Sequence, residues 1–306
     1  MVLAVAGIIF VAIGQAGINP KVAANGSFSP TPVAVMSKLL GASTSTPPPT
    51  ATFLPPTPPP PPHLAIVPRV PIWSDEFNAP VGTSPNPTKW HLDTGGGGWG
   101  NNEWEYYTNS PANASQDGQG HLVITARRPV RAPGNCSVGP CDITSARLET
   151  QGLFAGTYGR FEARIKAPVG LGLWPAFWLL PDDDIGEIDI METNGRDPGI
   201  VSGTLHGPGT EKTGGLSRQM GMLPGNMADE FHIYAVDWTP AGIVWSVDGQ
   251  VFHTVKRTDP RLSHWAYDKP FYVLLNLAVG SEDPGYPDAT TSFPAKMLVD
   301  YVRVYR

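Results

Sequence analysis

The sequence predicts an all-β fold, an antiparallel β-sandwich or jelly roll. Glycine and proline number 34 each among 306 residues, so turn formers are abundant, and only 16% of the residues are charged. Short runs rich in β-branched and aromatic residues recur, whereas few windows show an apolar period of 3.6 residues over twelve positions. We therefore do not expect a helical bundle or a long coiled coil.

Composition and charge also limit the function. The hydrophobic fraction of 41% is too high for a wholly disordered chain. A net charge of −6 provides no broad basic field, so no nucleic-acid partner is expected. The chain contains neither G-x-S-x-G nor H-E-x-x-H, which argues against a serine hydrolase and a zincin. A G-x-G-x-x-G match at residues 95–100 lacks the βαβ context of a dinucleotide site, and a glycine-rich loop fits it better.

Residues 1–24 have the pattern of a signal peptide or a membrane anchor. Residues 2–13 are all apolar or small, a run too short to span a bilayer but suited to the core of a signal peptide. Val22, Ala23 and Ala24 provide a small-residue cleavage site, but no basic residue precedes the apolar run. Two interpretations stay open, a cleaved export signal and an uncleaved N-terminal membrane tether, and both predict a secreted or cell-surface protein.

Residues 25–68 form a linker rich in proline, serine and threonine. Ten of the sixteen residues 47–62 are proline, which fixes φ and removes backbone donors. We expect an extended polyproline-II spacer of roughly 3 Å per residue. The alternative is a proline-rich ligand for a partner domain.

Residues 69–306 form the predicted folded domain, and four segments in it indicate strands. Residues 121–126 are a short β-rich run, and residues 243–255 form a hairpin around the type I′ turn signal Asp248-Gly249. Residues 271–278 have the apolar pattern of a central strand buried on both faces. Residues 297–305 alternate apolar and polar side chains and should close a sheet.

The segment Glu-Ile-Asp-Ile-Met-Glu at residues 187–192 is the most informative. On a strand, Glu187 and Asp189 share one face, but Glu192 lies at odd spacing from Glu187. One extra residue, a β-bulge at Ile190-Met191, would bring all three acids to the same face.

Three acids on one face admit three interpretations. Two carboxyl groups about 5–5.5 Å apart are what a double-displacement glycosidase requires, and their repulsion would keep one protonated near neutral pH. The acids could instead bind a hard cation such as calcium, or form a solvated surface. Catalysis is the interpretation that we favour.

The run Trp-Pro-Ala-Phe-Trp at residues 174–178 supports catalysis. Trp174 and Trp178 share parity on a strand, and indole faces suit the C–H faces of pyranose rings. The alternative, core tryptophan, is expected to hold for at least one of them. Pro181 and the acids 182–184 form a turn that returns the chain as the acidic strand, so aromatic and acidic side chains should share one groove.

At these residues the sequence resembles glycoside hydrolase family 16. The six-residue bulged motif resembles that of its laminarinase-like, endo-β-1,3-glucanase branch. Further matching segments occur in order along the chain, at residues 73–77, 97–107, 159–164, 231–238 and 300–305. The resemblance covers nearly all of the folded domain and none of the first 68 residues.

The resemblance implies a concanavalin-like jelly roll whose concave sheet forms the substrate groove. It implies that Glu187 is the nucleophile, Glu192 the general acid/base and Asp189 an assisting carboxylate. Six further residues are expected to line the groove: Trp99, Asn102, Arg164, Trp174, Trp178 and His206. For His206, a purely structural histidine is the alternative.

The resemblance also implies a structural calcium site, and it implies no cofactor for catalysis. The calcium ligands would be Glu76, Asp300 and a backbone carbonyl near Gly120. Cys136 and Cys141 flank a turn-prone loop that a disulfide could close, and reduced thiols are the alternative.

The bulged acidic strand, the paired tryptophans and the resemblance together predict a retaining endo-β-1,3-glucanase that acts on laminarin-like β-glucan. The N-terminal segment predicts that this enzyme is secreted, and we expect a monomer. Four alternatives use the same fold: a mixed-linkage β-glucanase, a galactan hydrolase, a transglycosylase and a non-catalytic carbohydrate-binding lectin.

Overall fold

A computed structural model describes residues 70–221 and 227–306, and all of these residues belong to one compact unit. The predicted signal or anchor segment 1–24 and the linker 25–68 lie outside the described residues. Within the two described ranges every regular element is a strand, and no helix is long and apolar enough to cross a membrane.

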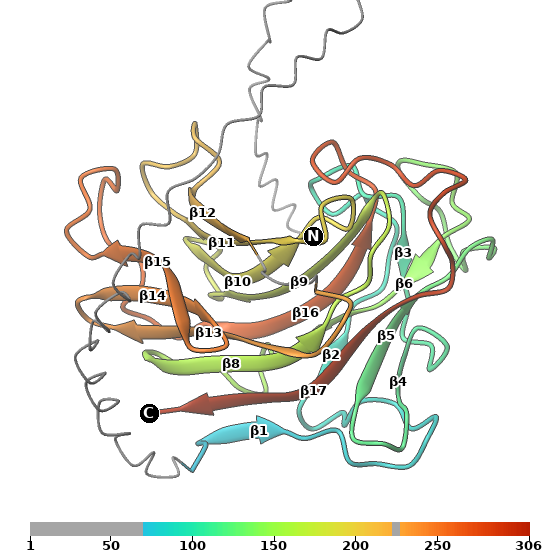
Figure 1. The fold of residues 1–306 in the computed structure, drawn as a ribbon, viewed down its shortest axis with the longest axis horizontal. Coiled ribbons are helices and arrows are strands. Elements are labelled where there is room, and N and C mark those ends of the chain that lie inside the picture. The colour runs from blue at the N-terminus through green and yellow to red at the C-terminus, as the bar shows by residue number, and fades with distance from the viewer. Residues whose placement is uncertain (1–69, 222–226) are drawn as a thin grey trace, which may run out of the picture. The chain divides into compact units, whose positions relative to one another are not determined.

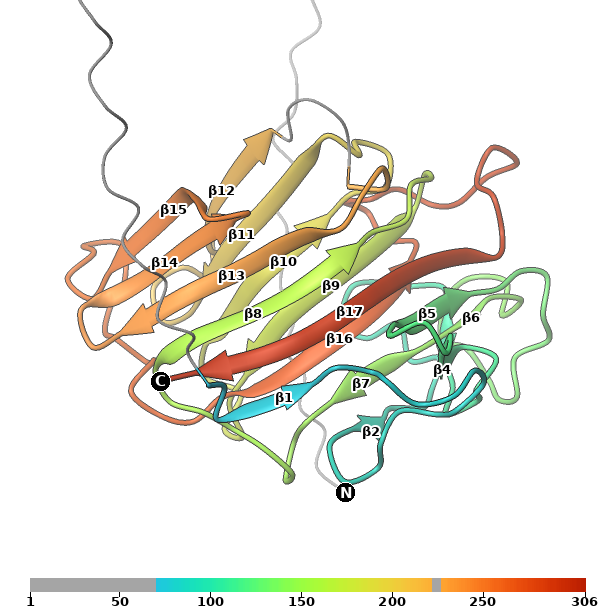
Figure 2. The same ribbon diagram turned by 60° about the horizontal axis from the view of Figure 1, so that its bottom comes forward.

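Two large antiparallel sheets pack as the layers of a sandwich, with strands that bend along their length (Figures 1 and 2). The eight-stranded sheet has the order β15-β14-β13-β8-β17-β5-β4, with β1 also pairing with β17. Its strands are β1 (Trp73–Asp75), β4 (Ala114–Gln116), β5 (Leu122–Ala126), β8 (Gly159–Lys166), β13 (His232–Thr239), β14 (Gly242–Val247), β15 (Gln250–Lys256) and β17 (Ala295–Tyr305).

The seven-stranded sheet has the order β12-β11-β10-β9-β16-β7-β2. Its strands are β2 (His91–Leu92), β7 (Arg147–Glu149), β9 (Leu173–Leu180), β10 (Glu187–Thr193), β11 (Ile200–His206), β12 (Leu216–Gly221) and β16 (Tyr272–Val279). A short parallel pair, β3 (Tyr106–Tyr107) and β6 (Thr144–Ser145), completes the fold. The prediction of an all-β sandwich of the jelly-roll type is confirmed.

The four strand segments expected from the sequence are all present. They correspond to β5, the hairpin β14–β15, β16 and β17. Asp248 and Gly249 both have positive φ, 50° and 79°, as a type I′ turn requires. Every residue of β16 is buried, which confirms the central strand.

The core lies between the two sheets and follows the two-residue period of the strands. On β16, Val273, Leu275, Leu277 and Val279 belong to the core, whereas the intervening residues face the opposite side of the sheet. On β8, Phe161, Ala163 and Ile165 enter the same core. Burial of these apolar side chains stabilises the sandwich, at roughly 25 cal/mol per Å² of apolar surface removed from water. The residues between them consequently face the outer sides of the two sheets.

Candidate active site

A β-bulge in β10 brings the three predicted acids to one face. The register with β11 pairs Asp189 with Thr204 and then Glu192 with Ser202, so β10 contains one extra residue between the two acids. Ile188, Ile190 and Met191 enter the core, and the acids take the other side. The predicted bulge is therefore confirmed. The outer face of the seven-stranded sheet that carries Glu187, Asp189 and Glu192 is called the site face below.

His206 lies among these acids on the neighbouring strand. It is directly opposite Glu187 in the β10–β11 register, and its Nε2 is 2.9 Å from Asp189 Oδ2. The carboxyl groups of Glu187 and Asp189 lie next to each other, and the charge of Asp189 acts on Glu187. One ligand atom from each of these three residues lies within 4.8 Å of the others, so the trio could also hold a cation. The structure thus brings His206 to the acids, as expected, and gives it an acidic partner.

Burial gives the three acids unusual proton affinities. Loss of water raises the pKa of Glu187 to about 8, and the adjacent charge of Asp189 adds to the effect. Burial, with the charge of Glu187, raises the pKa of Glu192 to about 7. Burial and the charge of Glu192 raise the pKa of Asp189 well above its usual range. The site therefore retains protons near neutral pH, as general acid catalysis requires.

The two tryptophans of β9 lie on the site face with the acids. The indole Nε1 of Trp174 donates to Glu192 Oε1 at 3.0 Å, and Nε1 of Trp178 donates to Asn276 Oδ1 at 2.8 Å. Both rings are half-buried, and neither belongs to the core cluster. The expectation that at least one would be a core residue is therefore wrong, because odd positions of β9 supply the core and even positions supply the site face.

An arginine that sequence reasoning missed links two of the aromatic rings. The guanidinium of Arg147, on β7, lies over the Trp178 ring at 4.8 Å and over the Trp99 ring at 5.1 Å. Its Nε donates to Asp93 Oδ2 at 2.8 Å. Trp99 belongs to the glycine-rich loop, where its indole donates to Gly95 O. Trp99, Arg147 and Trp178 thus form one polar-aromatic surface beside the acids.

Asn102 ends the same loop with a φ of 58° and an exposed side chain. Its contact with substrate stays a prediction.

The structure joins Cys136 and Cys141 in a disulfide, as predicted, and Cys136 forms a β-bridge with Gly96 of the glycine-rich loop. The disulfide loop therefore lies against the loop that carries Trp99.

Arg164 does not lie on the site face, and this prediction is wrong. It is on β8 of the other sheet, where its neighbours Ala163 and Ile165 fill the core and its own side chain points outward. Its Nη1 contacts Asp300 Oδ2 at 2.6 Å, and its guanidinium covers the Phe231 ring. Alternation along the strand shows that Arg164 is on an outer face but not which of the two sheets contains the strand.

The predicted calcium ligands are engaged elsewhere. Both carboxylate oxygens of Glu76 accept hydrogen bonds from Arg303, at 3.0 and 2.7 Å, and Asp300 pairs with Arg164. Carboxylates neutralised by arginines do not form the oxygen cage that calcium requires. The side chains of Glu76 and Asp300, as placed, therefore do not offer free carboxylates to a calcium ion, and a calcium site that includes the Gly120 carbonyl stays a prediction.

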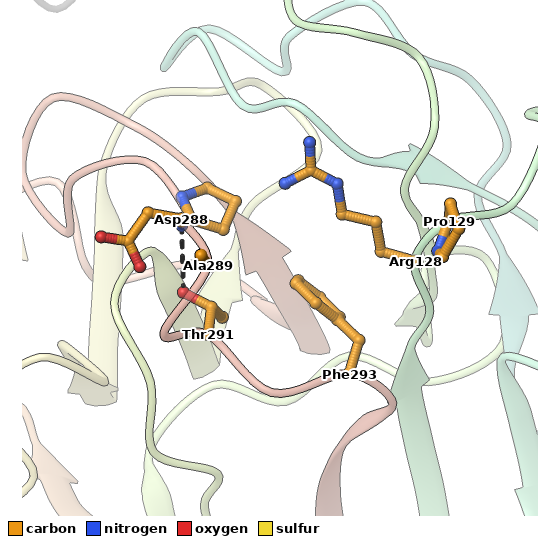
Figure 3. Close-up of a pocket in the computed structure, with 7 residues that line it drawn as sticks. Arg128, Pro129, Asp288, Ala289, Thr291 and Phe293 are labelled. Atoms are coloured by element: carbon orange, nitrogen blue, oxygen red, sulfur yellow. Dashed lines mark hydrogen bonds between the residues drawn. The ribbon is translucent and has the colours of Figure 1, made fainter.

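A cavity of about 530 Å³ lies outside the site face (Figure 3). Its walls come from the segments around Arg128 and Asp288, and it contains none of the predicted site residues. Arg128 donates from Nε to Asp142. Seven residues line the cavity: Arg128, Pro129, Pro287, Asp288, Ala289, Thr291 and Phe293.

Comparison with known proteins assigns the family. The family model of glycosyl hydrolases family 16 matches residues 101–303. A beta-glucanase of Rhodothermus marinus is 41% identical over 251 residues, which are 77% of this chain and 84% of the relative. The structure of an endo-beta-1,3-glucanase from Pyrococcus furiosus is 42% identical with a TM-score of 0.70, covering 77% of this chain and 93% of that structure. The laminarinase catalytic domain from Thermotoga maritima is 39% identical, also with a TM-score of 0.70, over 78% and 98% of the two chains. The bulged acidic strand and these matches agree, and the chain is a glycoside hydrolase that belongs to family 16.

Proposed function

We propose that the protein is a secreted endo-acting glycosidase that hydrolyses β-1,3-glucosidic links in laminarin-like glucans with retention of configuration. The observation that carries the proposal is the bulge of β10, which places Glu187, Asp189 and Glu192 together on a face lined by tryptophans. The names of the Pyrococcus endo-beta-1,3-glucanase and the Thermotoga laminarinase support β-1,3-glucan as the substrate, and the Rhodothermus relative is named a beta-glucanase.

In this mechanism the two glutamates act in turn. Glu187 attacks the anomeric carbon and forms a glycosyl-enzyme, while Glu192 gives its proton to the leaving oxygen. Glu192 then accepts a proton from water, which hydrolyses the intermediate. Trp174 supports the second step, because its indole N–H stabilises the ionised form of Glu192 at 3.0 Å.

We assign Asp189 as the group that holds the proton when Glu187 ionises for attack. Burial and the repulsion between the adjacent carboxyl groups favour a proton on one of them, and attack requires that this proton reside on Asp189. The positive charge of a protonated His206 would lower the pKa of Glu187 and of Glu192, which favours the ionised Glu187 that attack requires. No cofactor takes part in the proposed chemistry.

Sugar rings of the substrate would stack on the aromatic surface beside the acids. The indoles of Trp99 and Trp178 offer apolar faces, and the Arg147 guanidinium between them offers donors to hydroxyl groups. This surface extends from Trp178 on β9, the strand next to β10, to Arg147 on β7, three strands from β10. It therefore suits a chain of several sugars, in agreement with endo cleavage.

The test is a panel of purified polysaccharides, with products separated by thin-layer chromatography. Oligosaccharides released first from laminarin, and β-anomers seen first by proton NMR, would support the proposal. Preferential cleavage of mixed-linkage glucan or of a galactan would show that this polysaccharide, and not β-1,3-glucan, is the substrate. Binding without new products would identify a lectin, and products longer than the starting oligomer would identify a transglycosylase.

Export is tested separately by expressing the full chain and fractionating the culture. Activity in the medium would support cleavage after residue 24, and activity in washed membranes would support the tether. Activity confined to the soluble cell interior would contradict both.

A further inference from the structure

A second pair of acids is buried beside the site face, on the segment that leads into β3. Glu103 is 5% exposed and Glu105 is 0% exposed, and one residue separates them. Arg147, a cation whose field reaches Glu103, forms its ion pair with Asp93 instead. Within residues 70–221 and 227–306, neither glutamate has a salt bridge. The mechanism proposed above uses neither of them.

A directed chain of hydrogen bonds connects this pair to an indole on the site face. Trp178 Nε1 can only donate, so it fixes the amide of Asn276, whose Oδ1 accepts at 2.8 Å. Asn276 Nδ2 then donates to the hydroxyl of Tyr107 at 3.1 Å. That hydroxyl donates to Glu103 Oε2 at 3.2 Å. Oε2 of Glu103 must accept there, so it carries no proton.

The proton of the pair belongs to Glu105. Its Oε2 accepts from the backbone amide of Val279 at 2.6 Å, whereas its Oε1 is buried without a donor. A buried oxygen in that state is costly, and the acid whose charge acts on Glu105 is Glu103, two positions before it. A proton on Oε1 of Glu105, directed at Glu103, satisfies both carboxyl groups.

We propose that Glu103 and Glu105 share one proton and, through Tyr107 and Asn276, position the Trp178 indole for a sugar ring. The pair touches no reacting atom, so its members are positioning residues. The part played by Trp178 rests on the function proposed above, but the sharing of the proton does not.

The pair makes this part of the site sensitive to alkaline pH. Burial raises the pKa of both acids, and the charge of Glu103 raises that of Glu105 further. The titratable groups that face the pair are Tyr107 on β3 and Arg147 on β7, while β16 contributes a neutral amide side chain and the backbone amide of Val279. When the shared proton leaves, two buried charges repel each other behind the indole.

The kinetic test compares Tyr107→Phe and Glu105→Gln in the full chain on soluble β-1,3-glucan between pH 6 and pH 9. Tyr107→Phe keeps the ring and breaks the chain of hydrogen bonds, so we expect KM to rise about 3- to 10-fold and kcat to stay within about twofold. Glu105→Gln keeps a donor toward Glu103 and cannot ionise. Its KM should therefore equal that of the wild type at pH 6. The KM of the wild type should rise toward pH 9, and the KM of this variant should not. Unchanged KM in Tyr107→Phe, or an unchanged alkaline rise in Glu105→Gln, would overturn the proposal.

Tyr234→Phe is the matched control. Its hydroxyl is buried on β13 of the other sheet without a hydrogen-bond partner, so its removal should leave KM and kcat unchanged. A similar rise of KM in this control would assign the effect to general loss of packing and would contradict the proposal.

Thermal unfolding provides a readout that needs no substrate. Since the pKa of Glu105 is raised in the folded protein, its stabilising contribution is present at low pH and is lost as pH rises. The midpoint of Glu105→Gln should therefore fall less between pH 6 and pH 9 than that of the wild type. Parallel curves would refute the shared proton even if the glucanase function holds, and a difference would support it even if no glucan is cleaved.

Discussion

The outer faces of the two sheets contain the same types of charged side chain in opposite electrostatic settings. On the eight-stranded sheet, Glu76 pairs with Arg303 and Asp300 pairs with Arg164, and the hydrogen bonds from Arg303 lower the pKa of Glu76. On the site face, burial raises the pKa of Glu187 and of its neighbours, and within the described part of the chain the basic side chain that contacts these acids is that of His206.

This difference indicates that proton transfer at the site depends on burying carboxyl groups without an arginine partner. Carboxylates paired with arginine stay ionised, and each exposed pair contributes at most about 1 kcal/mol to the free energy of unfolding. The acids of β10 lose water without gaining an arginine, and the resulting free-energy cost is the source of their reactive protons. Matched substitutions on the two faces should therefore have unequal effects.

The largest effect is expected from Glu187→Gln. Loss of the nucleophile should reduce hydrolysis of β-1,3-glucan about 10³-fold or more, because no other carboxylate can attack from its position. Glu76→Gln, on the other outer face, should leave kcat within about twofold. Release of reducing sugar measures both. Activity of Glu187→Gln above a few per cent of the wild type would contradict the assignment of Glu187 as the nucleophile.

The next effect is expected from Asp189→Asn. An amide at this position cannot take the proton that Glu187 must lose, so kcat should fall about 10- to 100-fold with little change in KM. Asp237→Asn is the control, because Asp237 pairs with Arg160 on the opposite outer face. Equal kinetics for Asp189→Asn and the wild type would show that Glu187 ionises without help.

Trp174→Phe should have a smaller effect with a definite sign. The indole N–H lowers the pKa of Glu192, so its removal raises that pKa. Since the general acid must be protonated, the alkaline limit of kcat should move to higher pH while kcat falls a few-fold. A shift to lower pH, measured in pH–rate profiles, would contradict the assignment of the acid to Glu192.

Much of the site face could be predicted because strand parity is a local property. The odd spacing of Glu192 requires a bulge, and Asp248-Gly249 requires a tight turn, so short stretches of sequence were sufficient for both. The same reasoning failed for Arg164, because parity identifies an outward position but not the sheet to which the strand belongs. That choice depends on pairing between strands distant in sequence.

Residues whose roles depend on distant partners could not be predicted. Arg147 is defined by Trp99 and Trp178, which come from a loop and from another strand. Glu103 lies within a segment that supported the family resemblance, but its connection to Asn276 spans 173 positions and appears only when β16 is placed. Composition and spacing contain no sign of such contacts.

The smallest expected effect is a difference between the two outer faces in how thermal stability depends on pH. The raised pKa of Glu187 means that its contribution is fully present below about pH 4.5 and is lost as pH rises through about 8. Glu187→Gln should therefore match the wild type near pH 5 and unfold about 3–6 °C higher at pH 8. Glu76 has a lowered pKa, so its contribution is present above about pH 4.5 and is lost at lower pH.

Glu76→Gln should consequently unfold about 1–2 °C lower than the wild type at pH 7, with a smaller difference at pH 4. Thermal melts of the two variants across this pH range test the comparison directly. If Glu187→Gln were less stable than the wild type at pH 8, the acids of β10 would be as well compensated as those of the opposite face, and their raised proton affinity would need another cause.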